Sequence, residues 1–169
     1  MAAALSAPAS AAPPEIHYTV PAAVHPGQNV ELRLVGNHLA GTTALWNSFD
    51  ATTELASSEN NNTEANGVTY QVTVPETATA GIGGLRVATP EGVSTLKLVM
   101  IDDLSTVADN GQNKTIETAQ AIVPPVAIDG ACEPQSFDYY RISALAGQRL
   151  TFEVFAHRLG TALDPVIRL

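Results

Sequence analysis

Basic residues, aromatic residues and cysteine are all scarce in this sequence of 169 residues, and the shortages exclude several classes of protein. Eight Lys and Arg stand against 17 Asp and Glu, which gives a formal net charge of −9. Because nucleic acids and anionic membrane surfaces both attract clustered basic residues, we expect neither as a partner. No apolar run approaches the length of a transmembrane helix, so we expect no membrane insertion. The single cysteine, Cys132, excludes an intrachain disulfide and a zinc cluster of several thiolates.

Residues 1–14, MAAALSAPASAAPP, form a leader of low complexity that we expect to be disordered. Ala9-Ser10-Ala11 has the small-x-small form of a signal-peptidase site, but a basic n-region and an apolar stretch are missing. Two interpretations stay open: the remnant of an export signal that starts upstream, or a flexible leader with no targeting role. Export predicts a secreted, periplasmic or cell-surface location.

From residue 15 to residue 101 the hydrophobic pattern has a period of two. Apolar residues alternate with polar ones in the runs 30–34 and 68–74, which predicts half-buried strands. Further short strands are expected at 16–20, 44–46, 85–88 and 94–101. Turn-forming residues separate the strands, and we interpret Gly81–Gly84 as one of these hairpin turns. Residues 15–101 therefore predict a β-sandwich.

Residues 102–120 break this pattern and are interpreted as an acidic linker. The β pattern returns in residues 121–169, with strands expected at 126–128, 137–143, 150–156 and 165–169. In the run 150–156, Leu150, Phe152 and Val154 are expected to face a core. Because the chain stops within an expected strand, we expect a partial second sandwich. The predicted fold class is all-β, with two tandem β-sandwich units.

Two resemblances follow from particular residues. Pro14-Glu15-Ile16, the run VHPGQNVELRLVG from Val24 and the run VTVPETATAGIGGLRVATPEGVS from Val72 resemble the immunoglobulin-like IPT/TIG domains of bacterial surface proteins. The resemblance implies a spacer or adhesion module.

The second resemblance covers residues 109–169. Phe137-Asp138-Tyr139-Tyr140-Arg141-Ile142, Ala146-Gly147-Gln148-Arg149-Leu150 and the run from Leu163 to Leu169 resemble the bacterial pre-peptidase C-terminal (PPC) domain, a small jelly-roll-like sandwich of exported proteins. The pairing of the two modules resembles exported proteins of planctomycete-like bacteria.

No catalytic set is visible, and we predict that the chain is not an enzyme. None of the four histidines stands two or four residues from another, so no HxH or HExxH zinc motif exists, although His17 and His25 could meet in space. Cys132 stands beside Glu133, which disfavours a thiolate nucleophile, and we interpret it as a half-buried structural or turn cysteine. We expect no cofactor, with calcium as the one candidate ion.

Calcium prefers several oxygen ligands, and carboxylates are in surplus here. The candidate ligands are Asp109 and Asp138, with Asp102 and Asp103 nearby in the sequence. The PPC resemblance implies that some relatives bind calcium near this linker, but the acidic Glu-Pro-Asn-Asp opening of the family is replaced by Ala108-Asp109-Asn110-Gly111. We therefore expect at most weak calcium binding, with a solvated acidic linker as the alternative.

Trp46 is the candidate ligand-binding residue, because sugars stack on exposed aromatic faces. The alternative is a core tryptophan, which is common in sandwiches. The Asn-rich segment from Glu59 to Gly67 is interpreted as a bare flexible loop.

Three functions remain in view. The first is a noncatalytic spacer, adhesion or structural region of an exported bacterial protein, with a cell-surface polymer or the rest of its parent protein as partner. The second is an accessory region of a secreted peptidase or other hydrolase whose catalytic domain is absent from this chain. The third is a carbohydrate- or protein-binding module that uses Trp46.

Overall fold

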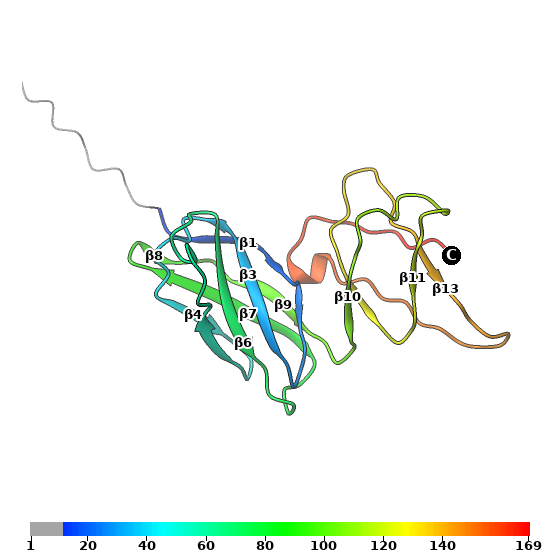
Figure 1. Ribbon diagram of the computed structural model, residues 1–169, viewed down its shortest axis with the longest axis horizontal. Coiled ribbons are helices and arrows are strands. Elements are labelled where there is room, and N and C mark those ends of the chain that lie inside the picture. The colour runs from blue at the N-terminus through cyan, green and yellow to red at the C-terminus, as the bar shows by residue number, and fades with distance from the viewer. Residues whose placement is uncertain (1–11) are drawn as a thin grey trace, which may run out of the picture.

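The computed structural model describes residues 12–169, and among them the chain forms strands and one 3-10 turn but no α-helix. Two lobes lie side by side along the long axis of the molecule (Figure 1). The larger lobe contains residues up to Ile101, and the smaller lobe contains residues 102–169. The predicted all-β class is confirmed. The predicted leader lies outside the described residues up to residue 11, and Pro14 is already buried.

One sheet of the larger lobe has four antiparallel strands in the order β1-β3-β6-β5. Its strands are β1 (Glu15–Val20), β3 (Asn29–Asn37), β6 (Gly67–Thr73) and β5 (Thr52–Leu55). The alternation along β3 buries Leu32 and Leu34 and leaves Arg33 exposed between them, as the period of two predicts. Leu32 lies opposite Tyr70 of β6.

The other sheet has the strand order β2-β9-β7-β4, with β8 also paired to β7. Its strands are β2 (Ala23–Val24), β9 (Lys97–Ile101), β7 (Gly81–Thr89), β4 (Ala44–Asn47) and β8 (Gly92–Val93). The β2–β9 pair is parallel, whereas the other pairs of this sheet are antiparallel. The parallel pair attaches Ala23 and Val24 to β9, the strand that leads into the smaller lobe.

The core of the larger lobe lies between the two sheets. It is made of apolar side chains from both: Ile16, Val24, Leu32, Leu34, Leu39, Leu45, Val68, Tyr70, Val72, Val74, Leu85, Val87, Val99 and Ile101. Each fully buried Leu or Val stabilises the fold by about 1.5–3 kcal/mol relative to an exposed one. The larger lobe therefore has the apolar centre that a sandwich needs.

The prediction of a hairpin turn at Gly81–Gly84 is wrong, because these residues form the first half of β7 and pair with β9. The glycines are needed for space rather than for a turn. A Cβ on Gly83 would lie 2.4 Å from Cδ1 of Phe49, and a Cβ on Gly84 would lie 2.7 Å from Cδ1 of Leu96. Glycine inside a strand commonly marks such a close approach.

The smaller lobe contains two short parallel strand pairs. They are β10 (Thr106–Ala108) with β12 (Ala127–Asp129), and β11 (Gln120–Ile122) with β13 (Tyr140–Ile142). β10 lies within the segment interpreted as a linker, so that segment contributes a strand to the lobe. The strands expected at 150–156 and 165–169 are absent from this fully described part of the chain. Phe152 and Val154 are 40% and 45% exposed there, so the prediction that they face a core is wrong.

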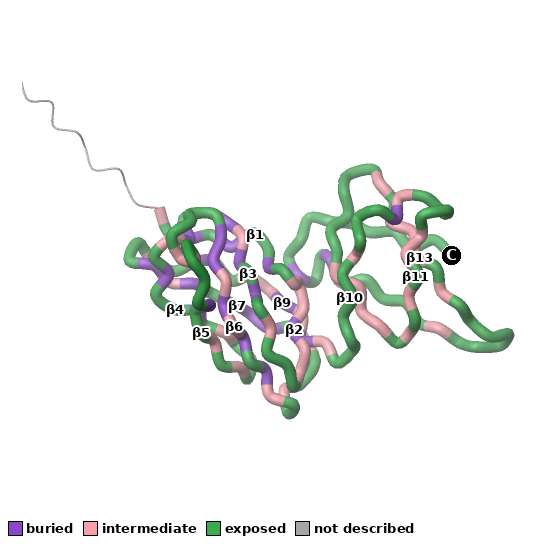
Figure 2. Tube along the Cα trace, in the orientation of Figure 1, coloured by how far each residue is buried: buried purple, intermediate pink, exposed green. Residues whose placement is uncertain are grey.

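An alternation of apolar and polar residues does not by itself make a strand, because the backbone N–H and C=O groups need a neighbouring strand to hydrogen-bond with. The smaller lobe offers no further ladder to residues 150–156. Within residues 102–169 the only buried residues are Asn113, Ala156 and Leu159. Figure 2 shows the same contrast between a buried interior in the larger lobe and a mostly exposed smaller lobe. The smaller lobe therefore lacks an apolar core of its own.

The two lobes are joined by direct contacts in addition to the chain. The backbone N–H of Ala22, just before β2, donates to Oδ2 of Asp129 at 2.8 Å. The 3-10 turn η1 (His157–Leu159) contacts β9 and lies between the lobes in Figure 1. Ala156 and Leu159, the buried apolar residues of the smaller lobe, are at this turn. We call these contacts the joint.

Candidate functional site

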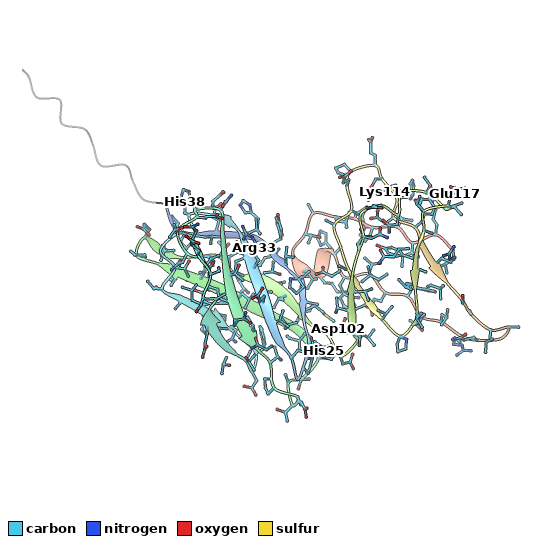
Figure 3. The ribbon with its side chains drawn as sticks, in the orientation of Figure 1. His25, Arg33, His38, Asp102, Lys114 and Glu117 are labelled. Atoms are coloured by element: carbon cyan, nitrogen blue, oxygen red, sulfur yellow. The ribbon has the colours of Figure 1, made fainter. Side chains whose placement is uncertain are left out.

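The residues that could carry nucleophilic chemistry are scattered. Nε2 of His17 lies 3.6 Å from Glu15 and 3.3 Å from Nδ2 of Asn37 on the surface of β1 and β3. His25 instead contacts the carbonyl of Pro26 with Nδ1, at 2.8 Å, beside the joint (Figure 3). Because the two imidazoles have different neighbours, these contacts give no support to a His17–His25 pair.

Cys132 is a free, exposed cysteine, so the interpretation as a half-buried residue is wrong. Its Sγ lies 3.7 Å from the Glu133 carbonyl and 3.9 Å from Oγ of Ser136. Neither neighbour is a base that could activate a thiol.

The two calcium candidates occur in one polar cluster of the smaller lobe, which we call the acidic cluster. It consists of Asp109, Asn113, Lys114, Asp138 and Tyr140. Backbone bonds hold it in place: the Asp109 N–H donates to the carbonyl of Asp129 (2.8 Å), and the Tyr139 N–H donates to the carbonyl of Asn113 (2.7 Å). The first bond ties Asp109 to the end of β12, and the second brings the segment before β11 to the residues directly before β13.

Asn113 is the one side chain of this lobe that is fully buried, at 0% exposed. Neither its Nδ2 nor its Oδ1 has a hydrogen-bond partner of good geometry among residues 12–169, and the same holds for Oδ1 of Asp109. Unpaired buried polar atoms are rare and costly in folded proteins. The centre of the smaller lobe is therefore polar.

Tyr140 reports on the same environment. Burial raises the pKa of Tyr140 to about 12, and the nearby carboxylates of Asp109 and Asp138 raise it further, against a lowering contribution from Asn113. The phenol carries its proton at neutral pH, as any tyrosine does, and the raised pKa extends this to more alkaline pH.

Lys114 and Asp138 form an ion pair through Nζ and Oδ1. The hydrogen bond to Asp138 raises the pKa of Lys114, and the charges of Asp138, Asp109 and Glu133 act in the same direction. Sequence reasoning missed Lys114, although it is a rare basic residue in an acidic segment. Within residues 12–169, no three His, Cys, Asp or Glu side chains converge as a metal site.

Trp46 occupies an outward position on β4, with 53% of its surface exposed, so the alternative of a core tryptophan is wrong. Leu45 takes the inward position in the same strand. Trp46 lies opposite Arg86 of β7, and cross-strand neighbours of this kind have side chains close together. The pair presents an aromatic face and a cation on the same side of the sheet.

The Asn-rich segment is anchored rather than bare. Asn61 bonds to the carbonyls of Ala56 (2.7 Å) and Thr69 (2.9 Å) and accepts from the Thr69 N–H (2.9 Å). Asn62 bonds in the same way to both backbone groups of Thr42, at 2.6 Å and 2.9 Å. Two asparagine side chains therefore fasten the loop to β6 and to the segment before β4.

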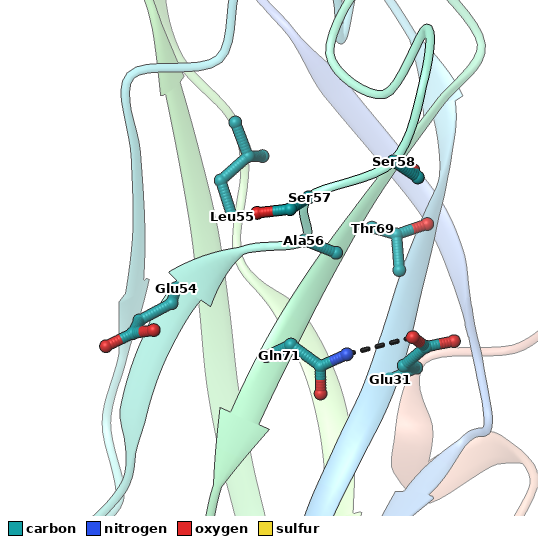
Figure 4. Close-up of a pocket in the computed structure, with 8 residues that line it drawn as sticks. All are labelled: Glu31, Glu54, Leu55, Ala56, Ser57, Ser58, Thr69 and Gln71. Atoms are coloured by element: carbon teal, nitrogen blue, oxygen red, sulfur yellow. Dashed lines mark hydrogen bonds between the residues drawn. The ribbon is translucent and has the colours of Figure 1, made fainter.

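A shallow pocket of about 390 Å³ lies on the outer face of the four-stranded sheet, beside the start of this loop (Figure 4). Glu31, Gln71 and Glu54 lie in register across β3, β6 and β5, and Gln71 Nε2 donates to Glu31 Oε1 at 2.9 Å. Serine and threonine hydroxyls complete the lining. The lining residues include no aromatic or basic side chain that would define a ligand, so we assign this pocket no function.

No protein-family model matches the sequence, and no curated protein matches it. Among solved structures, the chain is similar to the γ-CGTase from alkalophilic Bacillus clarkii, at 19% identity and a TM-score of 0.37. The similarity covers 60% of this chain and 14% of that enzyme's chain, so this chain spans only a small part of it. A similarity of this size carries no argument about fold or function. No helix among the described residues is both long and apolar enough to cross a membrane.

Proposed function

We propose that the chain is a noncatalytic structural region of an exported bacterial protein, in which two β modules act as a spacer or adhesion unit. In this proposal the larger lobe is an immunoglobulin-like module of the IPT/TIG type and the smaller lobe is a PPC-type module. The protein would be secreted, periplasmic or at the cell surface. Its partner would be a surface polymer or the rest of its parent protein.

The observation that carries this proposal is the joint. The Ala22–Asp129 hydrogen bond and the buried residues Ala156 and Leu159 connect the lobes at two places besides the chain itself. A flexible tether has no need of such contacts, whereas a spacer that holds its ends at a fixed separation depends on them. The scattered imidazoles and the exposed Cys132 support the noncatalytic part of the proposal.

The test measures how rigidly the lobes are connected. Cys132 is replaced by Ser, and spin labels are attached at Thr73→Cys on β6 and Arg141→Cys on β13, both exposed strand positions. We expect one narrow distance distribution by pulsed electron paramagnetic resonance. Asp129→Ala and Leu159→Ala should each broaden it, and Asp164→Ala, an exposed carboxylate of the same lobe, should not. A broad distance distribution in the labelled protein that keeps Asp129 and Leu159 would refute the proposal of a rigid spacer.

Trp46 supports a second candidate, a carbohydrate- or protein-binding module. An indole that is 53% exposed beside Arg86 offers a stacking face and a hydrogen-bond donor to a sugar ring. Trp46 is the single tryptophan, so its fluorescence reports binding directly. Titration with neutral and acidic polysaccharides should change the emission, and Arg86→Ala should weaken the response. Unchanged emission with every polymer would remove the carbohydrate version of this candidate.

A further inference from the structure

The two outer faces of the larger lobe differ in composition. On the four-stranded sheet, outward positions of β3 and β5 carry the charged residues Glu31, Arg33 and Glu54. On the five-stranded sheet, the outward positions of β4, β7, β8 and β9 carry a single charged residue and are otherwise apolar. They are Ala44, Trp46, Ile82, Gly84, Arg86, Ala88, Val93, Leu98 and Met100. We call this set the apolar face.

The strand register places these side chains on one side of the sheet. Leu85, in the middle of β7, is fully buried, so the alternate positions on either side of it face outward. Cross-strand partners share a face, which places Trp46 of β4 beside Arg86 of β7. Leu96 lies on the same side, because a Cβ on Gly84 would be 2.7 Å from its Cδ1. Leu96 therefore extends the apolar face between β8 and β9.

Much of the apolar face is open to solvent with the smaller lobe in place. Trp46, Ile82, Val93 and Leu96 are each between 45% and 57% exposed. Contiguous exposed apolar patches on folded proteins mark interaction surfaces. The composition also fits a protein interface, in which Trp, Met and Arg are enriched and Asp, Glu and Lys are depleted. The apolar face is therefore a docking surface for another protein surface.

Arg86 has no charged or aromatic partner among residues 12–169. The ion pairs of this part of the chain use other cations, and so do its cation–π contacts. Only eight basic residues stand against 17 acids in the whole sequence, so an unpaired arginine here is unusual. A guanidinium is weakly hydrated and stacks well on an indole, which makes it the cation that an apolar interface accepts most easily.

Two features favour a second copy of this chain as the occupant. The first is charge: two chains of net charge −9 repel each other, and the outward strand positions of the apolar face hold no acid. The second is symmetry. Trp46 and Arg86 are direct partners in one row of β4 and β7. A two-fold axis between these strands and parallel to them places Trp46 of each copy over Arg86 of the other, so the surface is complementary to itself.

The size of the face indicates a weak dimer. Three strands and four outward side chains per strand cover roughly 14 Å by 27 Å, or about 400 Å² for each copy. Stable interfaces bury about 800 Å² for each partner, and smaller ones are transient. A dissociation constant on the order of 0.1 mM follows from this comparison.

We propose that the apolar face is a self-association surface on which a second copy of the chain docks face to face, with Trp46 of each copy stacked on Arg86 of the other. The charged outer face of the four-stranded sheet then stays in solvent. This inference does not depend on the proposed spacer function, and it competes with the carbohydrate candidate for the same indole.

The experiment is sedimentation equilibrium of the full chain between about 5 µM and about 500 µM, a range that brackets a weak dimer. We expect the average mass to rise from that of a monomer toward that of a dimer. The emission of Trp46, the single tryptophan, should shift to shorter wavelength over the same range as the ring leaves water.

Two pairs of variants test the face itself. Trp46→Ala should weaken association at least about tenfold, whereas Tyr18→Ala, at a similarly exposed aromatic residue of the other sheet, should not. Val93→Glu places a like charge in both copies and should also weaken association at least about tenfold. Thr73→Glu adds the same charge to the exposed end of β6 and is its control. Circular dichroism shows whether each variant keeps its fold, and these positions are all exposed.

Salt distinguishes a second copy from an acidic partner. Sodium chloride screens the repulsion between two acidic chains, so it should strengthen self-association. A partner held by its carboxylates on Arg86 would instead be released.

Three results would overturn the proposal. One is a monomer at every concentration. Another is association that persists in both Trp46→Ala and Val93→Glu. The third is a chain that stays monomeric while its Trp46 emission responds to a polysaccharide, because the face would then belong to the carbohydrate candidate.

Discussion

Trp46 shows how little a short strand reveals about the direction of its side chains. β4 has only four residues, Ala44–Asn47, and an alternation of four residues fits either face of a sheet. Because Trp46 is exposed, we expect Trp46→Ala to change the free energy of unfolding by no more than about 0.5 kcal/mol. Chemical denaturation followed by circular dichroism measures this. A loss of several kcal/mol would mean that the indole packs against something.

The raised pKa of Tyr70 makes the free energy of unfolding depend on pH in the alkaline range. It is 4% exposed in the core, and burial raises its pKa from 10.0 to about 12. Below pH 10 the folded and unfolded chains both keep the phenol proton, so this contribution to stability is fully present. Between pH 10 and about 12 only the unfolded chain loses the proton, and stability falls by roughly 3 kcal/mol.

Urea denaturation at pH 9, 10 and 11 tests this decline. Tyr70→Phe has no proton to lose, so its stability should fall less steeply over the same range. Equal slopes for the two proteins would show that another group controls the alkaline transition.

The polar residues of the smaller lobe were only partly predictable. The surplus of carboxylates pointed to Asp109 and Asp138, and the structure pairs Asp138 with Lys114. Their partner could not be deduced from spacing, because Lys114 and Asp138 are 24 residues apart and meet through the backbone bond between Asn113 and Tyr139 and the pairing of β11 with β13. Sequence patterns report neighbours on one element and miss partners that the tertiary fold supplies.

At the scale of single elements, β7 contains glycines, Gly83 and Gly84, where even an added methyl group would meet neighbouring side chains. A Cβ on Gly83 would overlap Phe49 and would also lie 2.9 Å from Cδ1 of Ile101. Gly83→Ala should therefore cost about 1–3 kcal/mol of stability through overpacking. In a Phe49→Ala background the same change should cost less, because the overlapping ring is gone. Equal costs in both backgrounds, measured by chemical denaturation, would show that the ring is not the obstacle.

The sequence predicted the long strands well and the short or glycine-containing ones poorly. Runs such as 30–34 and 68–74 repeat their alternation often enough to identify the buried face, and both appear in β3 and β6. β5 has the sequence TTEL, which offers almost no apolar alternation, and it forms because β6 supplies a ladder beside it. The run 150–156 is the opposite case, since its alternation is clear but no ladder is present. Pairing, rather than pattern, decided both outcomes.

At the scale of the whole molecule, the lobes should differ sharply in independent stability. The larger lobe contains the whole apolar core, and the buried apolar residues of the smaller lobe lie at the joint. We expect a fragment of residues 12–101 to fold alone. A fragment of residues 102–169 should be largely unfolded, because a domain of this size with little buried apolar surface is marginal. Amide spectra by nuclear magnetic resonance distinguish the cases, and dispersed spectra from both fragments would contradict the prediction.

The bonding of Ala22 has a mechanical consequence. Its N–H is bonded to Asp129 of the smaller lobe, and its carbonyl accepts from the N–H of Met100 in β9 at 3.1 Å. A pull that separates the lobes is therefore carried in part by this peptide into the edge of the five-stranded sheet, beside the chain from β9 and the contacts of η1 with β9. The weakest link on that route is β2, which has only two residues. Under tension, β2 should peel from β9 before the central strands shear, so the molecule would lengthen in a small first step while its sandwich stays intact.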